Sequence, residues 1–193
     1  MGEVEGQVRS EHLDAEREAR RRAALAQIRQ YPDPVLRMRA NEVEEHDDAL
    51  ASLIERMTAL MQEARGVGLA APQVGVLRRV LVYQTSDEDP VVALVNPRLV
   101  STSEERESAE EGCLSLGAAT VIVPVERSTS LTVEGTSPAG EPLTVEAEGL
   151  EARVIQHELD HLDGVLIVDR TVPDERREAL GQLRPQPILG PLA

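Results

Sequence analysis

The segment Gln156-His157-Glu158-Leu159-Asp160-His161 places an H-E-x-x-H pattern inside a stretch with helical spacing. Two histidines four residues apart lie on one face of a helix, so both imidazoles can bind the same metal ion. The glutamate between them is suited to proton transfer. The segment therefore predicts a helix that carries a metal site, with His157 and His161 as ligands and Glu158 as a proton-transfer group.

A third ligand is expected from the single cysteine of the chain, Cys113, in the segment Glu111-Gly112-Cys113-Leu114-Ser115. This cysteine follows a glycine in an expected loop, whereas the other two histidines, His12 and His46, lie in charged segments. Two imidazoles and a thiolate suit Zn(II), Fe(II), Co(II) or Ni(II) rather than Ca(II) or Mg(II). Three protein ligands leave a position for water, which is typical of a catalytic site.

The composition predicts one folded domain with an aliphatic core. Hydrophobic residues make up 41% of the 193 residues, but there is no Phe, no Trp and only two Tyr, so Val, Leu, Ile and Ala must fill the interior. The net charge of -15 argues against a broad basic face for DNA. No secretory leader or membrane-spanning run is visible, and one cysteine forms no internal disulfide, so we expect a cytoplasmic protein.

Hydrophobic spacing predicts an α+β fold with β-sheets packed around the central helix that carries the H-E-x-x-H motif. An amphipathic helix is expected before it, over about residues 48–64, with Gly66 at its end. Helical spacing returns over residues 149–162, where Gly164 stops the helix. Strands are expected at Val76–Gln84, Val91–Val100, Val121–Val125, Ser130–Glu134, Leu143–Ala147 and Val165–Val168.

The two ends of the chain differ from its middle. Residues 1–24 are rich in Glu, Arg and Ala and are interpreted as a charged N-terminal extension, helical or flexible. A solvated extension is favoured there over a partner-binding helix. Residues 25–172 form the expected folded domain, and residues 173–193 form a short charged tail.

Three segments, taken together and in this order, resemble the signature motifs of the peptide deformylase family. They are Gly66-Val67-Gly68-Leu69-Ala70-Ala71-Pro72-Gln73, Glu111-Gly112-Cys113-Leu114-Ser115 and Gln156-His157-Glu158-Leu159-Asp160-His161. The resemblance covers about residues 25–170 and implies that residues 25–172 are a peptide deformylase catalytic domain. It implies a hydrolase that removes the N-formyl group from the initiator N-formylmethionine of nascent polypeptides and releases formate.

The resemblance also implies one divalent metal ion per chain, held by Cys113, His157 and His161. Fe(II) is the metal expected in the cell, and Zn(II), Ni(II) or Co(II) are expected alternatives in purified protein. Glu158 would accept a proton from water and return it to the leaving amine. The substrates would be N-formylmethionyl peptides.

Substrate positioning is implied for a second set of residues. The side-chain amide of Gln73 and the backbone N–H of Leu114 would stabilise the oxyanion. Contacts to the peptide backbone would come from Val67, Gly68 and Gly112, since glycines permit close approach. The resemblance further implies transient association with the ribosome. From the charge and the lack of a long apolar run we expect no DNA or membrane partner, and we expect a monomer, with a dimer as the alternative.

Three features depart from the usual pattern of the family. The segment Leu116-Gly117-Ala118-Ala119-Thr120 lacks the proline and arginine that commonly follow the cysteine motif. Glu151 stands where leucine is usual, and the long C-terminal helix of some members is missing or shortened. These departures predict an altered substrate range.

Two alternative functions stay open. The first is a general H-E-x-x-H metallopeptidase, which would draw its third ligand from a downstream His or Glu. The second is a non-catalytic binding protein on a deformylase scaffold, which would need neither Glu158 nor Gln73.

Overall fold

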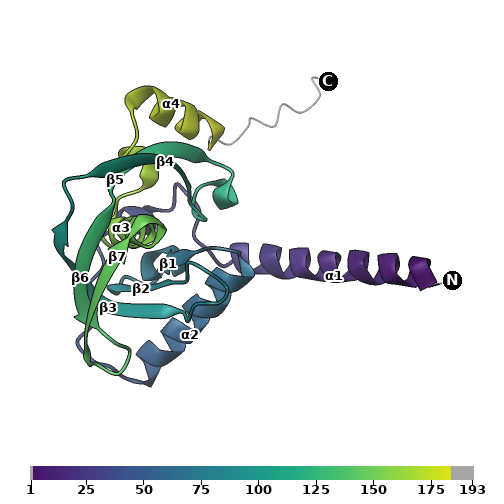
Figure 1. Ribbon diagram of the computed structural model, residues 1–193, viewed down its shortest axis with the longest axis horizontal. Coiled ribbons are helices and arrows are strands. Elements are labelled where there is room, and N and C mark those ends of the chain that lie inside the picture. Colours follow the sequence, from purple (N-terminus) through teal and green to yellow (C-terminus); the bar gives the residue numbers. More distant parts are fainter. Residues whose placement is uncertain (1, 184–193) are drawn as a thin grey trace, which may run out of the picture.

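The computed structural model describes residues 2–183, with side chains from residue 14 onward (Figure 1). Its strands form two antiparallel sheets. The first has the order β1 (Gly68–Ala70), β2 (Val80–Tyr83), β3 (Val92–Thr102), β6 (Ser130–Thr136) and β7 (Pro142–Glu148). The second pairs β4 (Arg106–Gly112) with β5 (Ile122–Ser128). The mixture of helices with antiparallel sheets confirms the α+β prediction.

Helices and short 3-10 turns connect and cover these sheets. The α-helices are α1 (Gly2–Leu25), α2 (Asp48–Glu63), α3 (Gly149–Leu162) and α4 (Pro173–Gln182). The 3-10 turns are η1 (Pro34–Arg37), η2 (Ala71–Val74), η3 (Gly117–Ala119) and η4 (Ile167–Asp169). In Figure 1, α1 projects away from the rest of the molecule, and α3 is seen end-on between the β4–β5 pair and the larger sheet. None of the helices between residues 2 and 183 combines the length and apolar character that a membrane crossing requires.

Helices α2 and α3 pack on opposite faces of the five-stranded sheet, and β2 shows why. Side chains alternate between the two faces of a strand. Val80 and Val82 belong to the core that includes the apolar side of α2. Leu81 and Tyr83 belong to the core that includes the apolar side of α3. Because both faces are buried, the sequence of β2 is apolar throughout.

The buried interior is aliphatic, as the composition predicts. Among the residues described with side chains, Tyr83 is the one aromatic side chain of the fully buried set, and it is surrounded by leucine, valine and isoleucine. A third cluster, beneath β5 and α4, contains Cys113 together with Leu116, Val123 and Ala179. The cysteine ligand expected from the sequence is therefore supported by packed aliphatic side chains.

The ends of the two main helices test the expected stop signals. Gly164 adopts φ +74 after α3, and the Val165 N–H donates to the Asp160 carbonyl, so the expected stop is confirmed. The expected stop at Gly66 is wrong. Arg65 adopts the left-handed conformation, with φ 58, and the Gly66 N–H donates to the Met61 carbonyl.

Several strand predictions need correction. Val165–Val168 is not a strand, because this segment turns into η4, where the Leu166 N–H donates to the Asp169 carboxylate at 2.9 Å. The strand expected at Val76–Gln84 is limited to β2. The short strand β1 and the polar strand β4 were not predicted.

The C-terminal segment is also more ordered than the sequence suggested. Residues 173–182 form α4, which lies against β5 and η4 and buries Ala179. The remainder of the expected tail, residues 184–193, lies outside the described residues. The expected N-terminal extension coincides with α1, whose Ala24 is fully buried against α2.

The left-handed turn after α3 yields a stability prediction. An alanine Cβ at position 164 would lie 2.6 Å from the Arg37 carbonyl oxygen, so Gly164→Ala adds a steric clash to the left-handed strain. We expect the free energy of unfolding to fall by about 2–4 kcal/mol in urea denaturation. Gly149→Ala is the matched control, since Gly149 has φ +56 but an added Cβ meets nothing within 4 Å. Equal losses in the two variants would contradict the clash.

Candidate active site and metal centre

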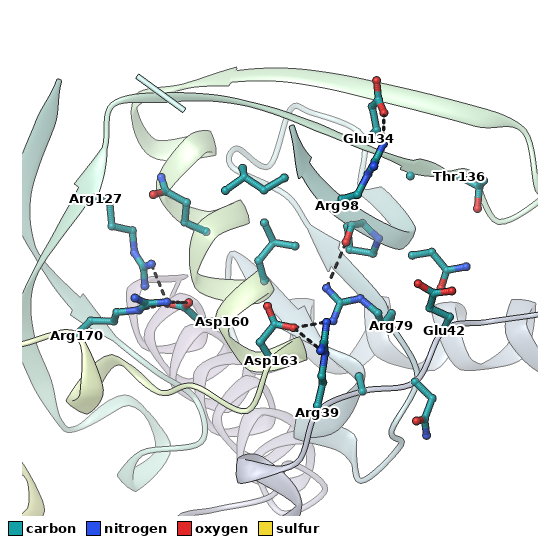
Figure 2. A pocket seen from close by; sticks show the side chains of 18 of the residues that line it. Arg39, Glu42, Arg79, Arg98, Arg127, Glu134, Thr136, Asp160, Asp163 and Arg170 are labelled. Atoms are coloured by element: carbon teal, nitrogen blue, oxygen red, sulfur yellow. Dashed lines mark hydrogen bonds and ion pairs between the residues drawn. The ribbon is translucent and has the colours of Figure 1, made fainter. Parts of the chain in front are cut away.

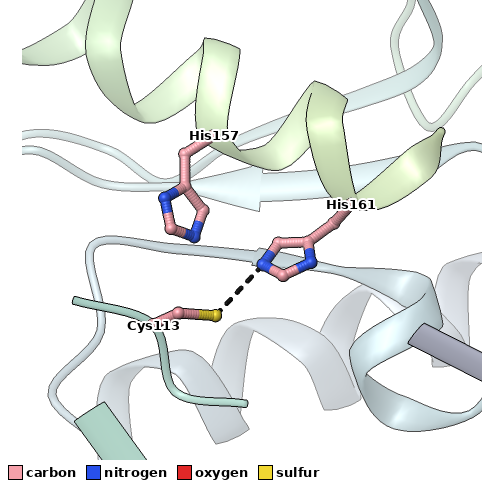
Figure 3. Close-up of side chains that lie close together, drawn as sticks. All are labelled: Cys113, His157 and His161. Carbon is pink, nitrogen blue, oxygen red and sulfur yellow. Dashed lines mark hydrogen bonds between the residues drawn. The ribbon is translucent and has the colours of Figure 1, made fainter. Parts of the chain in front are cut away.

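The three side chains expected to bind metal come together at one end of the interior. Helix α3 presents His157 and His161 from the same face, and Cys113 comes from the segment that follows β4 (Figure 3). One ligand atom from each residue lies within 4.8 Å of the others. The Cys113 Sγ is 3.2 Å from the Nε2 of His161. A cysteine and two histidines that lie 44 and 48 positions later in the chain thus form a compact set of one sulfur and two nitrogen donors that could hold a metal.

A buried carboxylate fixes the orientation of one imidazole. The Oε2 of Glu111 lies 3.0 Å from the Nδ1 of His157, which leaves the Nε2 of that ring to face the ligand cluster. The same carboxylate receives two hydrogen bonds from Arg127, at 2.6 and 2.9 Å, and one from Arg153 at 2.7 Å. A carboxylate behind a histidine ligand sets its tautomer and holds its ring in place.

The network around Glu111 continues along α3. The guanidinium of Arg127 also donates to Asp160 at 2.9 Å, and Arg170 donates to the same carboxylate at 2.5 Å. Gln156 bonds both the N–H and the carbonyl of Ser128 in β5, at 3.2 and 2.9 Å. The glutamine and aspartate of the motif thus attach α3 to the β4–β5 pair, so the rotation of the helix about its axis is fixed.

The electrostatics of the cluster shift the pKa values of its two imidazoles in opposite directions. Burial lowers the pKa of His157, but its hydrogen bonds with Cys113 and Glu111 outweigh this and raise the pKa to about 10. Burial and the charge of His157 lower the pKa of His161 well below its usual value. The Nδ1 of His161 is buried without a hydrogen-bond partner among the described residues. A divalent cation among a thiolate and two neutral imidazoles satisfies these requirements, so the residues fit a metal ion.

Gln73 is buried beside the cluster with its amide held in one orientation. Its Oε1 accepts a hydrogen bond from the Ala70 N–H at 2.8 Å. The Nε2 therefore faces the Oγ of Ser115 at 3.2 Å and the Sγ of Cys113 at 3.8 Å. The backbone N–H of Leu114, next to the cysteine, donates to no acceptor within the described part of the chain.

Glu158 lies against Gly68, the first residue of β1. Burial raises the pKa of its carboxyl to about 7, although His157 and Arg127 oppose the shift. Its Oε2 is buried and has no hydrogen-bond partner in the described residues. A Cβ on Gly68 would lie 2.4 Å from the Oε1 of Glu158, so only a glycine at this position leaves room for the carboxylate.

A cleft of about 270 Å³ connects these groups to solvent. Its walls include every residue expected at the site except His161, namely Val67, Gly68, Gln73, Gly112, Cys113, Leu114, His157 and Glu158. One wall is the segment before β1 and the other is the end of β4. Val67 and Leu150 are 46% and 55% exposed, so the rim presents apolar side chains.

Comparisons with known proteins agree with this arrangement. The family model described as polypeptide deformylase matches residues 25–177. The chain belongs to the polypeptide deformylase family. A peptide deformylase from Natranaerobius thermophilus is 44% identical over 155 residues, which cover 80% of this chain and 97% of that protein. One from Acidothermus cellulolyticus is 46% identical over 162 residues, covering 83% and 87%.

Solved structures of peptide deformylases share the fold. The enzyme from Legionella pneumophila has a TM-score of 0.76 at 40% identity and covers 81% of this chain and 91% of its own. The enzyme from Synechococcus elongatus, in complex with actinonin, has a TM-score of 0.76 at 38% identity, covering 82% and 91%. The chain is therefore an enzyme of the deformylase class, a family that depends on metal and acts on formylated nascent peptides.

Two departures from the usual deformylase pattern have a structural explanation. Glu151 does not line the cleft, because its carboxylate accepts a hydrogen bond from the Tyr83 hydroxyl at 2.8 Å. Burial and this contact raise the pKa of Tyr83. The segment after Ser115 forms η3, where Ala118 and Ala119 have positive φ and Ala119 lines the cleft. This wall therefore contributes no charged side chain from η3.

A second, larger groove of about 1100 Å³ lies over residues of α3 that do not line the deformylase cleft (Figure 2). It is rich in arginine, but each of these guanidinium groups forms an ion pair with a carboxylate. The pairs are Arg39 and Arg79 with Asp163, Arg98 with Glu134, Arg106 with Glu126, and Arg127 and Arg170 with Asp160. These arginines thus serve mainly to join neighbouring elements.

The sequence analysis did not predict the residues that hold the candidate metal ligands in place through hydrogen bonds. Glu111 lies two residues before Cys113, and Asp160 directly precedes His161. Their closeness to the candidate metal ligands in the sequence could have indicated a supporting role. Arg127 gave no signal, because it lies in an ordinary strand with its contacts 16 and 33 residues away. The role of Ser115 beside Gln73 was likewise not predicted.

The buried Arg127 yields a prediction on stability and its pH dependence. Arg127→Met leaves two buried carboxylates with fewer partners, so we expect the free energy of unfolding at pH 7 to fall by about 3–5 kcal/mol. Burial raises the pKa of Glu111, but its hydrogen bonds with His157 and Arg127 lower it from 4.5 to about 2. The stabilisation by Glu111 is therefore present above pH 4.5 and is lost as the pH falls towards 2.

Urea denaturation between pH 2 and 7 measures both effects, and the difference between wild type and Arg127→Met should shrink as the pH falls. Arg106→Met is the control, because Arg106 and Glu126 are 3.7 Å apart with exposed side chains. It should cost less than about 1 kcal/mol. A loss for Arg127→Met no larger than this would show that the buried network contributes little.

Proposed function

We propose that the protein is a metal-dependent peptide deformylase that hydrolyses the N-formyl group of N-formylmethionine on nascent polypeptides and releases formate. The observation that carries the proposal is the Cys113, His157 and His161 cluster beside the buried Glu158, whose Oε2 has no hydrogen-bond partner among the described residues. A cysteine upstream of the motif as third ligand also favours a deformylase over a general metallopeptidase, which would use a downstream His or Glu.

We assign the metal to Cys113, His157 and His161, with Fe(II) as the ion in the cell and Zn(II), Ni(II) or Co(II) as substitutes. Bound there, the metal would supply a Lewis acid for water and for the formyl carbonyl. The hydrogen bond between His157 and Glu111 engages the Nδ1 of that ring, so its Nε2 would be the atom that binds the metal.

Glu158 moves the proton in this proposal. Its unpartnered Oε2 is available to a water molecule at the site, and it takes the proton as the water attacks the formyl carbon. The C–N bond then breaks, and Glu158 returns the proton to the departing amine. The products are formate and a peptide with a free N-terminus. A non-catalytic binding protein would have no use for a base in this position.

Gln73 and Leu114 stabilise the developing oxyanion. The fixed amide of Gln73 directs its Nε2 towards the cluster, and the Leu114 N–H is free of other acceptors in the described residues. Donors that are already in place act without reorganisation at the moment of reaction.

The substrate peptide lies between the edges of the two sheets. Strand β1 has a neighbour only in β2, and β4 only in β5, so each has an unpaired edge within the described sheets. An extended peptide pairs with such edges through its backbone. We assign these contacts to Val67 and Gly68 on one side and Gly112 on the other, and place the methionine side chain against the apolar rim.

The remaining assignments follow from the reaction. We propose residues 25–172 as the catalytic domain, with residues 1–24 and 173–193 outside it. A substrate on nascent chains favours a cytoplasmic location and transient association with the ribosome, as a monomer or a dimer.

The main test is formate release from formyl-Met-Ala-Ser by anaerobically purified protein, with bound metal quantified on the same sample. Glu158→Gln should keep about one metal per chain, since the ligands are untouched, and should lower kcat by about 10²–10⁴-fold because proton transfer is lost. Unchanged turnover in this variant would exclude the proposed base, and stoichiometric metal without formate release from wild type would point to a binding protein.

The contact between Gly68 and Glu158 provides a second test. In Gly68→Ala the added methyl displaces the carboxylate, so we expect kcat to fall by about 100-fold while the folded state is retained. Gly181→Ala, where an added Cβ in α4 meets nothing within 4 Å, should keep wild-type kcat. Wild-type turnover in Gly68→Ala would mean that the position of Glu158 is not critical.

A further inference from the structure

Arg65 stands at the mouth of the cleft in a backbone conformation that arginine rarely adopts. Its φ of 58 belongs to the left-handed region, at the position after α2 where glycine is the usual residue. The Cβ of an arginine makes this conformation unfavourable, and glycine would avoid the cost. Strain of this kind is often found at functional sites. The side chain is therefore expected to have a use that glycine could not provide.

The guanidinium of Arg65 is exposed and has no carboxylate partner among the residues described with side chains. The other arginine of the same cleft, Arg153, is bonded to Glu111. Glu110 lines the opposite wall, but no ion pair joins it to Arg65. Arg65 is thus the arginine of this cleft that has no carboxylate partner within the described part of the chain, whose full sequence has a net charge of -15.

The position of Arg65 along the cleft indicates which part of a substrate it would meet. The reacting end is marked by Cys113 on one wall and by Gly68, in contact with Glu158, on the other. Arg65 lies three residues before Gly68. An extended peptide advances about 3.3 Å per residue, so residues two and three of a formylated peptide reach this distance from the reacting end.

We propose that Arg65 is a specificity-determining residue that favours formyl peptides with a carboxylate side chain at position two or three, following the formylmethionine. The inference rests on the proposed deformylase function. An acidic side chain gains a charge-assisted contact with the guanidinium, whereas a lysine side chain is repelled. Ala119 is the residue that η3 contributes to this cleft, and Glu110 lies on the opposite wall. Because Glu110 would repel an acidic side chain, a preference for a carboxylate has to come from Arg65.

The test compares kcat and KM for matched formyl peptides with amidated C-termini, which removes the terminal carboxylate as a second anion. The series is formyl-Met-Ala-Asp, formyl-Met-Ala-Asn and formyl-Met-Ala-Lys, together with the same three residues at position two. For wild type, kcat/KM should be about two- to five-fold higher for Asp than for Asn at the position in contact, mainly through KM, and lowest for Lys. Raising NaCl to about 1 M should reduce this preference.

Four variants separate charge from backbone conformation. Arg65→Ala and Arg65→Gly should deformylate the Asn peptides at the wild-type rate but lose the Asp preference, and Arg65→Gly should also raise Tm. Arg65→Lys should retain the preference, and Arg65→Glu should reverse it towards Lys. Arg56→Ala is the matched control, because Arg56 is an exposed arginine on α2 that does not line the cleft. It should behave as wild type.

Equal kcat/KM of wild type for the Asp, Asn and Lys peptides would overturn the inference and leave the deformylase function intact. An Asp preference that survives in Arg65→Gly would also overturn it. Failure of wild type to release formate from any peptide of the series would instead overturn the proposed function, and with it the inference.

Discussion

The carboxylate of Glu111 is the point on which the site and much of the fold depend. It bonds His157 of α3, Arg127 of β5 and Arg153 of α3, and it lies near the end of β4, two residues before Cys113. A buried charge is tolerated only when its partners are complete. The sheet pair and the helix must therefore meet in one register, and that register is the one that brings Cys113 to the two histidines.

The same helix is fixed from its other side by apolar packing. Strand β2 is buried on both faces, with α2 covering one and α3 the other. Mainly aliphatic side chains fill these layers, with Tyr83 on the α3 side, and the alternation along β2 divides its residues between the two. Helix α3 is thus held by apolar contacts on one side and by paired charges on the other. Its histidines lie at the boundary, where a cleft reaches the interior.

Close approach of backbone segments forms the walls of that cleft. A Cβ at Gly66 would meet the Leu114 side chain at 2.8 Å, and one at Gly68 would meet Glu158 at 2.4 Å. The G-x-G pattern thus allows the segment before β1 to pass both the cysteine loop and the H-E-x-x-H helix. Arg65 differs from these glycines, because a bulky residue occupies a left-handed backbone position that is suited to glycine. The contrast explains how adjacent residues serve packing in one case and, in our proposal, charge recognition in the other.

The sequence by itself determined which residues would cluster as candidate metal ligands, the two main helices, five of the strands in outline and the aliphatic nature of the core. These features rest on local spacing: two histidines four positions apart, a period near 3.6 in α2 and α3, and β-branched runs in the sheet. Only the tertiary structure decided the limits of the strands, the formation of η4 in place of a last strand, and the polar strand β4. It also decided the pairing of Arg127 and Glu111 behind His157. The physical reason is that these features depend on partners distant in the chain, 46 residues apart for Glu111 and His157, which no local pattern encodes.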